Sequence, residues 1–319
     1  MSSPSPPPPF DPGALRLGCD LRRSGVEPCR DPAWHHVSHG AWLPAQQWAE
    51  LSPERRHAAL VYASGLRQRS RSPRTYALTS AAAIWGLPRI EAWPEPVTVL
   101  VADPAARGSR LVRPHLGAPA EAVDVEGVRV TSVARTVADL ARTGSLVTAV
   151  AAADHALRHR MCSADELAAE VAAIPRSSPG RRMAALVRDL ADARSMSPGE
   201  SLSRAQMYLL NVPRPELQRS RRDALGLIGV VDFDWGSAVG EFDGQVKYRV
   251  QPGADPQEAG EVVWREKKRE DRLRRQAEVG RWVWAEARDR NALATVLAGI
   301  GIRSLPRNTW FDLGARRAG

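Results

Sequence analysis

Apolar and polar residues follow two different periods along the chain, and these periods separate expected helices from expected strands. SPERRHAALVYASGL and VARTVADLA repeat apolar side chains at helical spacing, whereas PVTVLVAD and VVDFDW have the β-branched or alternating pattern of strands. Ser52, Ser132 and Ser163 open three of the helices, where a hydroxyl can cap free backbone N–H groups. Gly86 and Pro88 end another. Helices and strands mixed along the chain predict an α/β (α+β) fold.

Changes in these patterns divide the chain into successive parts. A proline-rich tract with basic residues after it predicts a disordered N-terminal tail. The segment SMSPGES interrupts the helical pattern at Ser195–Ser201, and a strand-rich region follows it. We therefore expect a tail, a mixed α/β region, a second domain and a C-terminal tail, over residues 1–33, 34–195, 196–305 and 306–319.

Composition adds a strongly basic charge. The 319 residues include 45 lysines and arginines against 36 acids, a formal net charge of +9. This excess is typical of proteins with an anionic partner, most often nucleic acid, and a GC-rich genome that favours arginine is the alternative explanation. The three cysteines form no CxxC pair, and the sequence shows neither a signal peptide nor an apolar run of membrane-spanning length. We expect a cytoplasmic protein without membrane association.

Four carboxylates lie close together in VVDFDWGSAVGEFDG. Residues two apart share a strand face, so Asp232 and Asp234 lie together, as do Glu241 and Asp243 on the next strand. The link between the strands is short enough for a hairpin, which brings Asp232 close to Glu241. Adjacent carboxylates repel unless a cation intervenes, and oxygen ligands suit Mg²⁺ or Mn²⁺, which can activate water at a phosphodiester. The alternative is a solvated acidic face with a turn after Asp243.

A specific order of elements runs from residue 197 to residue 302. Glu200 lies in a helix, and then come VDF with Asp232, GEFDG with Glu241, the basic helix REKKREDRLR and the strand GRWVW. This order resembles the PD-(D/E)XK nuclease superfamily and is most similar to its very-short-patch-repair endonuclease branch. The resemblance implies a restriction-endonuclease-like mixed sheet flanked by helices, in the order αβββαβ. It also implies that Asp232 and Glu241 hold Mg²⁺, with Glu200 supporting them.

One position departs from that family's pattern. The family keeps a lysine two residues after the glutamate, where this chain has Asp243. Lys247 lies further along with the same strand parity and is the candidate replacement. Two hypotheses follow: a Mg²⁺-dependent endodeoxyribonuclease that uses Asp232, Glu241 and Lys247, or an inactive nuclease fold that serves for binding.

The charged helix expected from Trp264 to Val279 carries more cations than anions. Pairs such as Glu270–Arg274 neutralise some of them, and the rest can contact DNA phosphates beside the carboxylates. The alternative is a solvated helix without a ligand. The residues that we assign to nucleic-acid binding are Arg265, Lys267, Lys268, Arg269 and Arg272.

Packing explains two groups of residues, one of tryptophans and one of histidines, better than ligand binding does. RWVWAEARD alternates as a strand, with Trp282 and Trp284 on one face, where core packing explains them better than base stacking. His35, His36 and His39 invite a metal-site hypothesis. No cysteine or acid lies nearby in the sequence, so surface or packing roles are favoured.

The segments WHHVSHGAWL, ALTSAAAIWGLP, VTVLV and GVRVTSVARTVADLA occur in this order between residues 34 and 160. They resemble the AbiEi-type antitoxins of type IV toxin–antitoxin systems. That resemblance implies a winged helix on operator DNA, a following α/β domain and a cognate toxin as partner. Here LRRSGVEPCRDPA takes the place of the recognition helix, and Pro28 and Pro32 interrupt it, so we expect a degenerate winged helix. A transcriptional regulator or antitoxin is therefore the alternative function.

Overall fold

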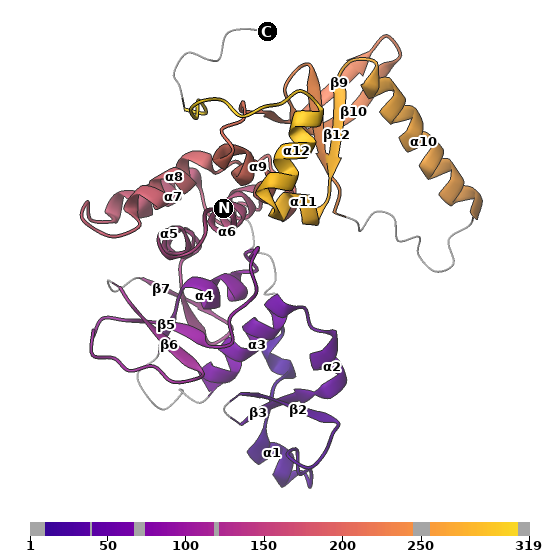
Figure 1. Cartoon of the computed structure of the whole chain (residues 1–319). Coiled ribbons are helices and arrows are strands. Elements are labelled where there is room, and N and C mark those ends of the chain that lie inside the picture. Colours follow the sequence, from indigo (N-terminus) through magenta and orange to yellow (C-terminus); the bar gives the residue numbers. More distant parts are fainter. Residues whose placement is uncertain (1–9, 39, 67–73, 118–120, 245–255, 312–319) are drawn as a thin grey trace. The chain divides into compact units, whose positions relative to one another are not determined.

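The computed structural model describes residues 10–38, 40–66, 74–117, 121–244 and 256–311, with the backbone alone at 256–263 and 265 (Figure 1). The chain divides into two compact units, Met1–Ala191 and Asp192–Gly319, a few residues before the expected boundary. Helices accompany sheets with both parallel and antiparallel strand pairs, which confirms the predicted α/β (α+β) class. Among the described residues, no helix is both long and apolar enough to cross a bilayer.

The first unit contains two sheets. The smaller is antiparallel with the strand order β1-β3-β2. The larger has the order β6-β5-β4-β8-β7, in which β5–β6 and β4–β8 are parallel pairs. The strands are β1 (Arg16–Leu17), β2 (Trp34–Ser38), β3 (Ala41–Pro44), β4 (Thr75–Tyr76), β5 (Val97–Val101), β6 (Val112–Leu116), β7 (Ala122–Val125) and β8 (Val128–Thr131).

Helices of the first unit begin and end where local signals predict. The Ser132 hydroxyl accepts the Arg135 N–H at the start of α5, and Ser163 and Glu166 form a capping box on α7. Gly86 ends α4 in the left-handed region, at φ 69°. The helices are η1 (Pro12–Ala14), α1 (Gly18–Arg23), α2 (Ala45–Glu50), α3 (Pro53–Leu66), α4 (Leu78–Trp85), α5 (Val133–Thr143), α6 (Leu146–Arg158), α7 (Ala164–Ala173) and α8 (Arg181–Leu190).

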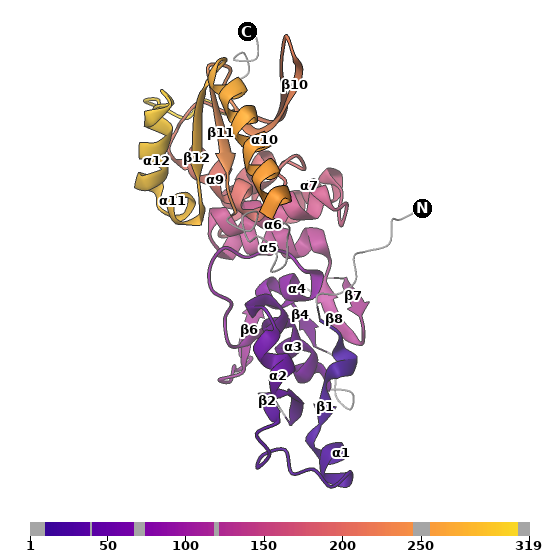
Figure 2. The same ribbon diagram turned by 90° about the vertical axis from the view of Figure 1, so that its right-hand side faces the viewer.

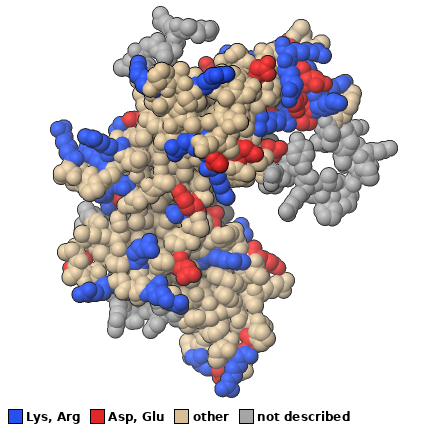
Figure 3. Space-filling model, viewed as in Figure 1, with Lys and Arg blue, Asp and Glu red and all other residues tan. Residues whose placement is uncertain are grey.

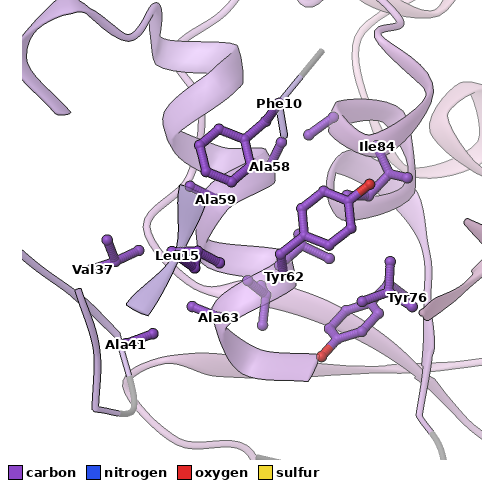
Figure 4. Packing of buried hydrophobic residues seen from close by; sticks show 14 of the residues in the cluster. Phe10, Leu15, Val37, Ala41, Ala58, Ala59, Tyr62, Ala63, Tyr76 and Ile84 are labelled. Carbon is purple, nitrogen blue, oxygen red and sulfur yellow. The ribbon is translucent and has the colours of Figure 1, made fainter. Parts of the chain in front are cut away.

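The core of the first unit forms around α3 (Figure 4). The small side chains of Ala58, Ala59 and Ala63 let the helix approach both sheets closely. Phe10 and Leu15 pack into the same cluster and are 4% and 7% exposed. The predicted disordered tail is therefore wrong for residues 10–33, because these apolar side chains fix the segment to the core.

The segment that contains Pro28 and Pro32 is not helical. Residues 24–33 form turns between α1 and β2, and none of them lies in a helix. Arg22 and Arg23 lie in the last turn of α1. His35 stacks on Trp48 with ring centroids 4.4 Å apart, which supports a packing role; His39 lies outside the described residues.

The second unit is built on a four-stranded mixed sheet of order β12-β11-β10-β9. The β11–β12 pair is parallel and the other pairs are antiparallel. The order α9-β9-β10-β11-α10-β12 is the expected αβββαβ order, with helices flanking a mixed sheet. The elements are α9 (Pro198–Leu209), β9 (Glu216–Asp223), β10 (Gly226–Asp234), β11 (Ala238–Phe242), α10 (Pro256–Arg274), β12 (Glu278–Trp282), α11 (Trp284–Arg288) and α12 (Arg290–Gly299).

Side chains on the two faces of β12 contact different helices. The Trp282 indole N–H donates to the Ser203 hydroxyl of α9 at 2.8 Å. Val279, three residues earlier, packs instead with Val239 and with Leu273 of α10. The sheet is thus covered by α9 on one face and by α10 on the other.

Two predictions near the C-terminus are wrong. The expected strand RWVWAEARD stops at Trp282, and α11 begins at Trp284, because the Glu286 carboxylate accepts the Val283 N–H and starts a helix there. Trp282 and Trp284 therefore do not share a strand face. The C-terminal tail predicted from residue 306 is wrong up to residue 311, because Trp310 is buried and its indole donates to the carbonyl of Val212.

Candidate functional site

The carboxylate of Asp232 lies where β10 and β11 separate. The ladder between these strands ends at the Phe233–Gly240 pair, one residue from Asp232. Asp232 Oδ2 accepts the backbone N–H of Phe242 on β11 at 2.9 Å. A side-chain oxygen thus satisfies a backbone donor next to the end of the ladder. The expected hairpin between the two strands is confirmed.

Glu200 of α9 and Asp232 are bridged by one side-chain amide. Gln218 Nε2 donates to Glu200 Oε2 at 2.9 Å and to Asp232 Oδ1 at 3.1 Å. The backbone of Gln218 has φ 53°, a left-handed conformation that is costly for a residue other than glycine. Gln218 was not predicted from the sequence, because a polar residue in a charged strand carries no signal of a partner on another element.

The surroundings of Glu200 disfavour its charged form. Burial raises its pKa to about 7, and the negative charge of Asp232 adds to that shift. Hydrogen bonds from the Met196 N–H, the Ser197 hydroxyl and the Gln218 amide act in the opposite direction. Two carboxylates joined by a neutral amide favour either a bound proton or a bound cation.

We expect the second unit to lose stability as the pH rises from about 5 to about 8. The pKa of Glu200 is about 7 in the folded chain and 4.5 in an unfolded one. The folded state therefore binds the proton more tightly, so the stabilisation is complete below the unfolded pKa and is lost as the pH passes the folded one. Urea unfolding across this range measures the effect. Glu200→Gln should flatten the pH dependence; a slope equal to that of the wild type contradicts the assignment.

Glu241 lies in a network of ion pairs with arginines and is not paired with the carboxylate of Asp232. Arg269 of α10 contacts it at 2.5 Å, and Arg281, its register neighbour on β12, contacts it at 3.0 Å. Glu266 and Glu270 of α10 share the Arg281 guanidinium. The two acids that the sequence assigned to one metal therefore have different partners: a backbone amide and Gln218 for Asp232, and two arginines for Glu241.

Two of the five predicted nucleic-acid contacts hold α10 on the sheet. Arg269 crosses Gly229, where an added Cβ would lie 2.6 Å from its Nε, and donates to the carbonyl of Val230. Arg272 contacts Asp223 at 2.5 Å. Both guanidinium groups are engaged within the unit.

The remaining predicted cations differ in their surroundings. Lys267 is exposed, and Lys268 Nζ lies 3.5 Å from the ring centroid of the exposed Trp264. Figure 3 shows basic and acidic side chains interleaved at this end of the second unit. The side chain of Arg265 and the whole of Lys247 lie outside the described residues.

Asp234 has a structural role that the sequence did not show. Its side chain is 0% exposed, and both oxygens accept from Arg221 at 2.6 Å. The solvated-face alternative is therefore wrong for this residue. Asp243 continues the ladder beyond β11, since its N–H donates to the carbonyl of Trp282 at 2.9 Å.

The oxygen donors around Asp232 suit a hard divalent cation in their chemistry. Within the part of the chain that the structure describes, no group of three or more His, Cys, Asp and Glu side chains is arranged to hold a metal. Asp232 and Glu200 offer carboxylate oxygens at one place. Glu241 is instead paired with Arg269 and Arg281.

Comparison with known proteins gives no relative. No protein-family model, no curated protein and no solved structure matches this chain.

Proposed function

We propose that the chain is a cytoplasmic DNA-interacting protein whose second unit is a PD-(D/E)XK-like nuclease domain, with Mg²⁺-dependent phosphodiester hydrolysis at Asp232. The supporting observation is the αβββαβ order together with Glu200 and Asp232 bridged by Gln218 at the end of the β10–β11 ladder. The net charge of +9 supports a polyanionic partner.

Asp232 and Glu241 would hold the Mg²⁺ ion, with Glu200 as the supporting acid and Mn²⁺ as a substitute. When bound, the ion polarises a phosphate and lowers the pKa of a coordinated water. Among the chain's own groups, Gln218 orients Asp232 and Glu200 toward each other. Arg269 of α10 and Arg281 of β12 bring positive charge next to Glu241, and the family has its lysine two residues after this glutamate.

Replacing Asp232 by asparagine is expected to reduce DNA cleavage by about 100-fold or more, because the amide keeps the size of the carboxylate and removes its charge. Purified wild type, Asp232→Asn and the matched control Asp271→Asn, an exposed acid on α10, are incubated with plasmid DNA and Mg²⁺. The control should cleave as the wild type does. Equal cleavage by wild type and Asp232→Asn, or none by either, contradicts the catalytic part of the proposal.

A second function is favoured by the surroundings of Glu241. Its charge is matched by two arginines, and Asp243 stands where the nuclease family has a lysine. These features suit a non-catalytic transcriptional regulator or antitoxin of a type IV toxin–antitoxin system, with a cognate toxin as partner. Sequence-dependent and steeply salt-dependent DNA binding without metal, together with no cleavage, supports this function.

A further inference from the structure

The far half of the β9–β10 hairpin exposes large apolar side chains. Leu225 at the turn is 79% exposed, Leu227 is 54% exposed and Val230 is 45% exposed. Figure 2 shows the tip of this hairpin standing clear of the helices of its unit. Single exposed apolar residues are common, but three within the six residues 225–230 mark a binding surface.

The exposed residues lie on a side of the hairpin that α10 does not cover. Ile228 and Val231 are buried in the cluster that contains Leu273 of α10. Leu227 and Val230 are exposed, and so are the residues that face them across the ladder, Arg222 and Ser220. Side chains directly opposite each other in an antiparallel pair share a face. The hairpin therefore has one covered face and one open, mixed apolar and basic face.

Arg222 lies on the open face opposite Leu227, and further exposed arginines lie elsewhere on β9 and just after α10. Arg222 and Arg275 are exposed and make no ion pair within the described residues. Arg219 forms an ion pair with Glu216, but both side chains are more than half exposed, so this ion pair contributes little to stability. These three arginines remain accessible to an anionic partner.

The open face also ends near the candidate site. Val230 precedes Asp232 by two residues on β10, a separation of about 7 Å along a strand. A ligand lying along the open face thus reaches the carboxylates of Asp232 and Glu200.

We propose that the open face of the β9–β10 hairpin enters a groove of duplex DNA, with Leu225 and Leu227 against the bases and Arg222 against phosphates; this rests on the proposed DNA-interacting function. Two-stranded ribbons fit DNA grooves, and leucine side chains can wedge between base steps while arginines neutralise the backbone. A second copy of the chain is disfavoured as occupant, because the edge strand β9 carries Arg219, Arg221 and Arg222, which oppose pairing with a like-charged edge.

Duplex binding in EDTA, followed by fluorescence anisotropy over a series of salt concentrations, tests the proposal without cleavage. Leu225→Ser/Leu227→Ser should raise Kd about tenfold or more and leave the slope of log Kd against log salt unchanged, because apolar area is lost and phosphate contacts remain. Arg222→Ala should reduce that slope by about the amount expected for the loss of one phosphate contact. The matched control is Leu116→Ser on β6 of the first unit, where the leucine is 57% exposed, close to the 54% of Leu227; this variant should bind as the wild type does.

Three outcomes overturn the proposal in different ways. If the wild type binds duplex and the leucine variant binds equally well, the hairpin contact is wrong and the DNA-interacting function stands. If the wild type binds no duplex even at low salt, both are wrong. If the leucine variant keeps its DNA affinity but changes from dimer to monomer in sedimentation, the open face joins copies of the chain. Because both leucines are exposed to solvent, replacing them should leave the fold intact. An unchanged thermal melting curve of the variant verifies this.

Discussion

Replacing Arg221 with alanine is expected to lower the free energy of unfolding of the second unit by about 3–5 kcal/mol. Both oxygens of Asp234 accept from this guanidinium at 2.6 Å, and the Asp234 side chain is 0% exposed. Without Arg221, the Gly236 N–H is the donor that remains among the described contacts of that carboxylate. A buried charge without its partner costs more than the pair itself contributes, so the loss exceeds that of an exposed ion pair.

Urea unfolding followed by tryptophan fluorescence measures this loss. Arg274→Ala is the matched control, because Arg274 forms a similar pair with Glu270 but is 59% exposed, so its removal should cost less than about 1 kcal/mol. A double variant, Arg221→Met/Asp234→Leu, leaves no charge without a partner and should be more stable than Arg221→Ala alone. Equal losses of unfolding free energy for Arg221→Ala and Arg274→Ala would show that the burial of Asp234 does not determine the size of the loss.

Signals confined to a few neighbouring residues predicted the fold well. Ser132, Ser163 and Gly86 mark helix ends because a cap depends on the backbone within one turn. The order of elements in the second unit followed from periodicity in the same way. Phe10 and Trp310 were missed for the opposite reason: each is a single aromatic residue in a polar segment, and only a distant surface determines whether it is buried.

The candidate site was predicted only in part, because its partners come from distant elements. Alternation and a short turn brought Asp232 and Glu241 onto neighbouring strands. The sequence pattern could not show that Gln218, fourteen residues away, forms a hydrogen bond with Asp232. Nor could it show that Arg269, twenty-eight residues away, forms an ion pair with Glu241. Such contacts depend on how α10 and β9 lie against the sheet, and no local pattern encodes that. The sequence therefore identified the chemical groups but not which of them interact.

Replacing Trp282 with alanine is expected to cost about 3–5 kcal/mol, the range for large-to-small changes of buried tryptophan. Trp282 is 2% exposed and stacks on Phe233 with ring centroids 5.4 Å apart. Gly240 makes room for the indole, since a Cβ there would lie 2.4 Å from a ring carbon. Without the ring, a cavity remains between the sheet and α9, and the Ser203 hydroxyl loses its indole donor.

Trp282→Phe separates packing from hydrogen bonding. Phenylalanine keeps most of the stack on Phe233 and removes the indole N–H, and Ser203 still donates to the carbonyl of Gly199 at 2.7 Å. Its loss should therefore be about 1–2 kcal/mol, below that of Trp282→Ala, in the same urea unfolding experiment. Because α9 also carries Glu200, the alanine variant should weaken the pH dependence of stability assigned to that carboxyl, whereas the phenylalanine variant should keep it. Equal stability of the two variants would mean that the hydrogen bond to Ser203, rather than the filled volume, holds α9 on the sheet.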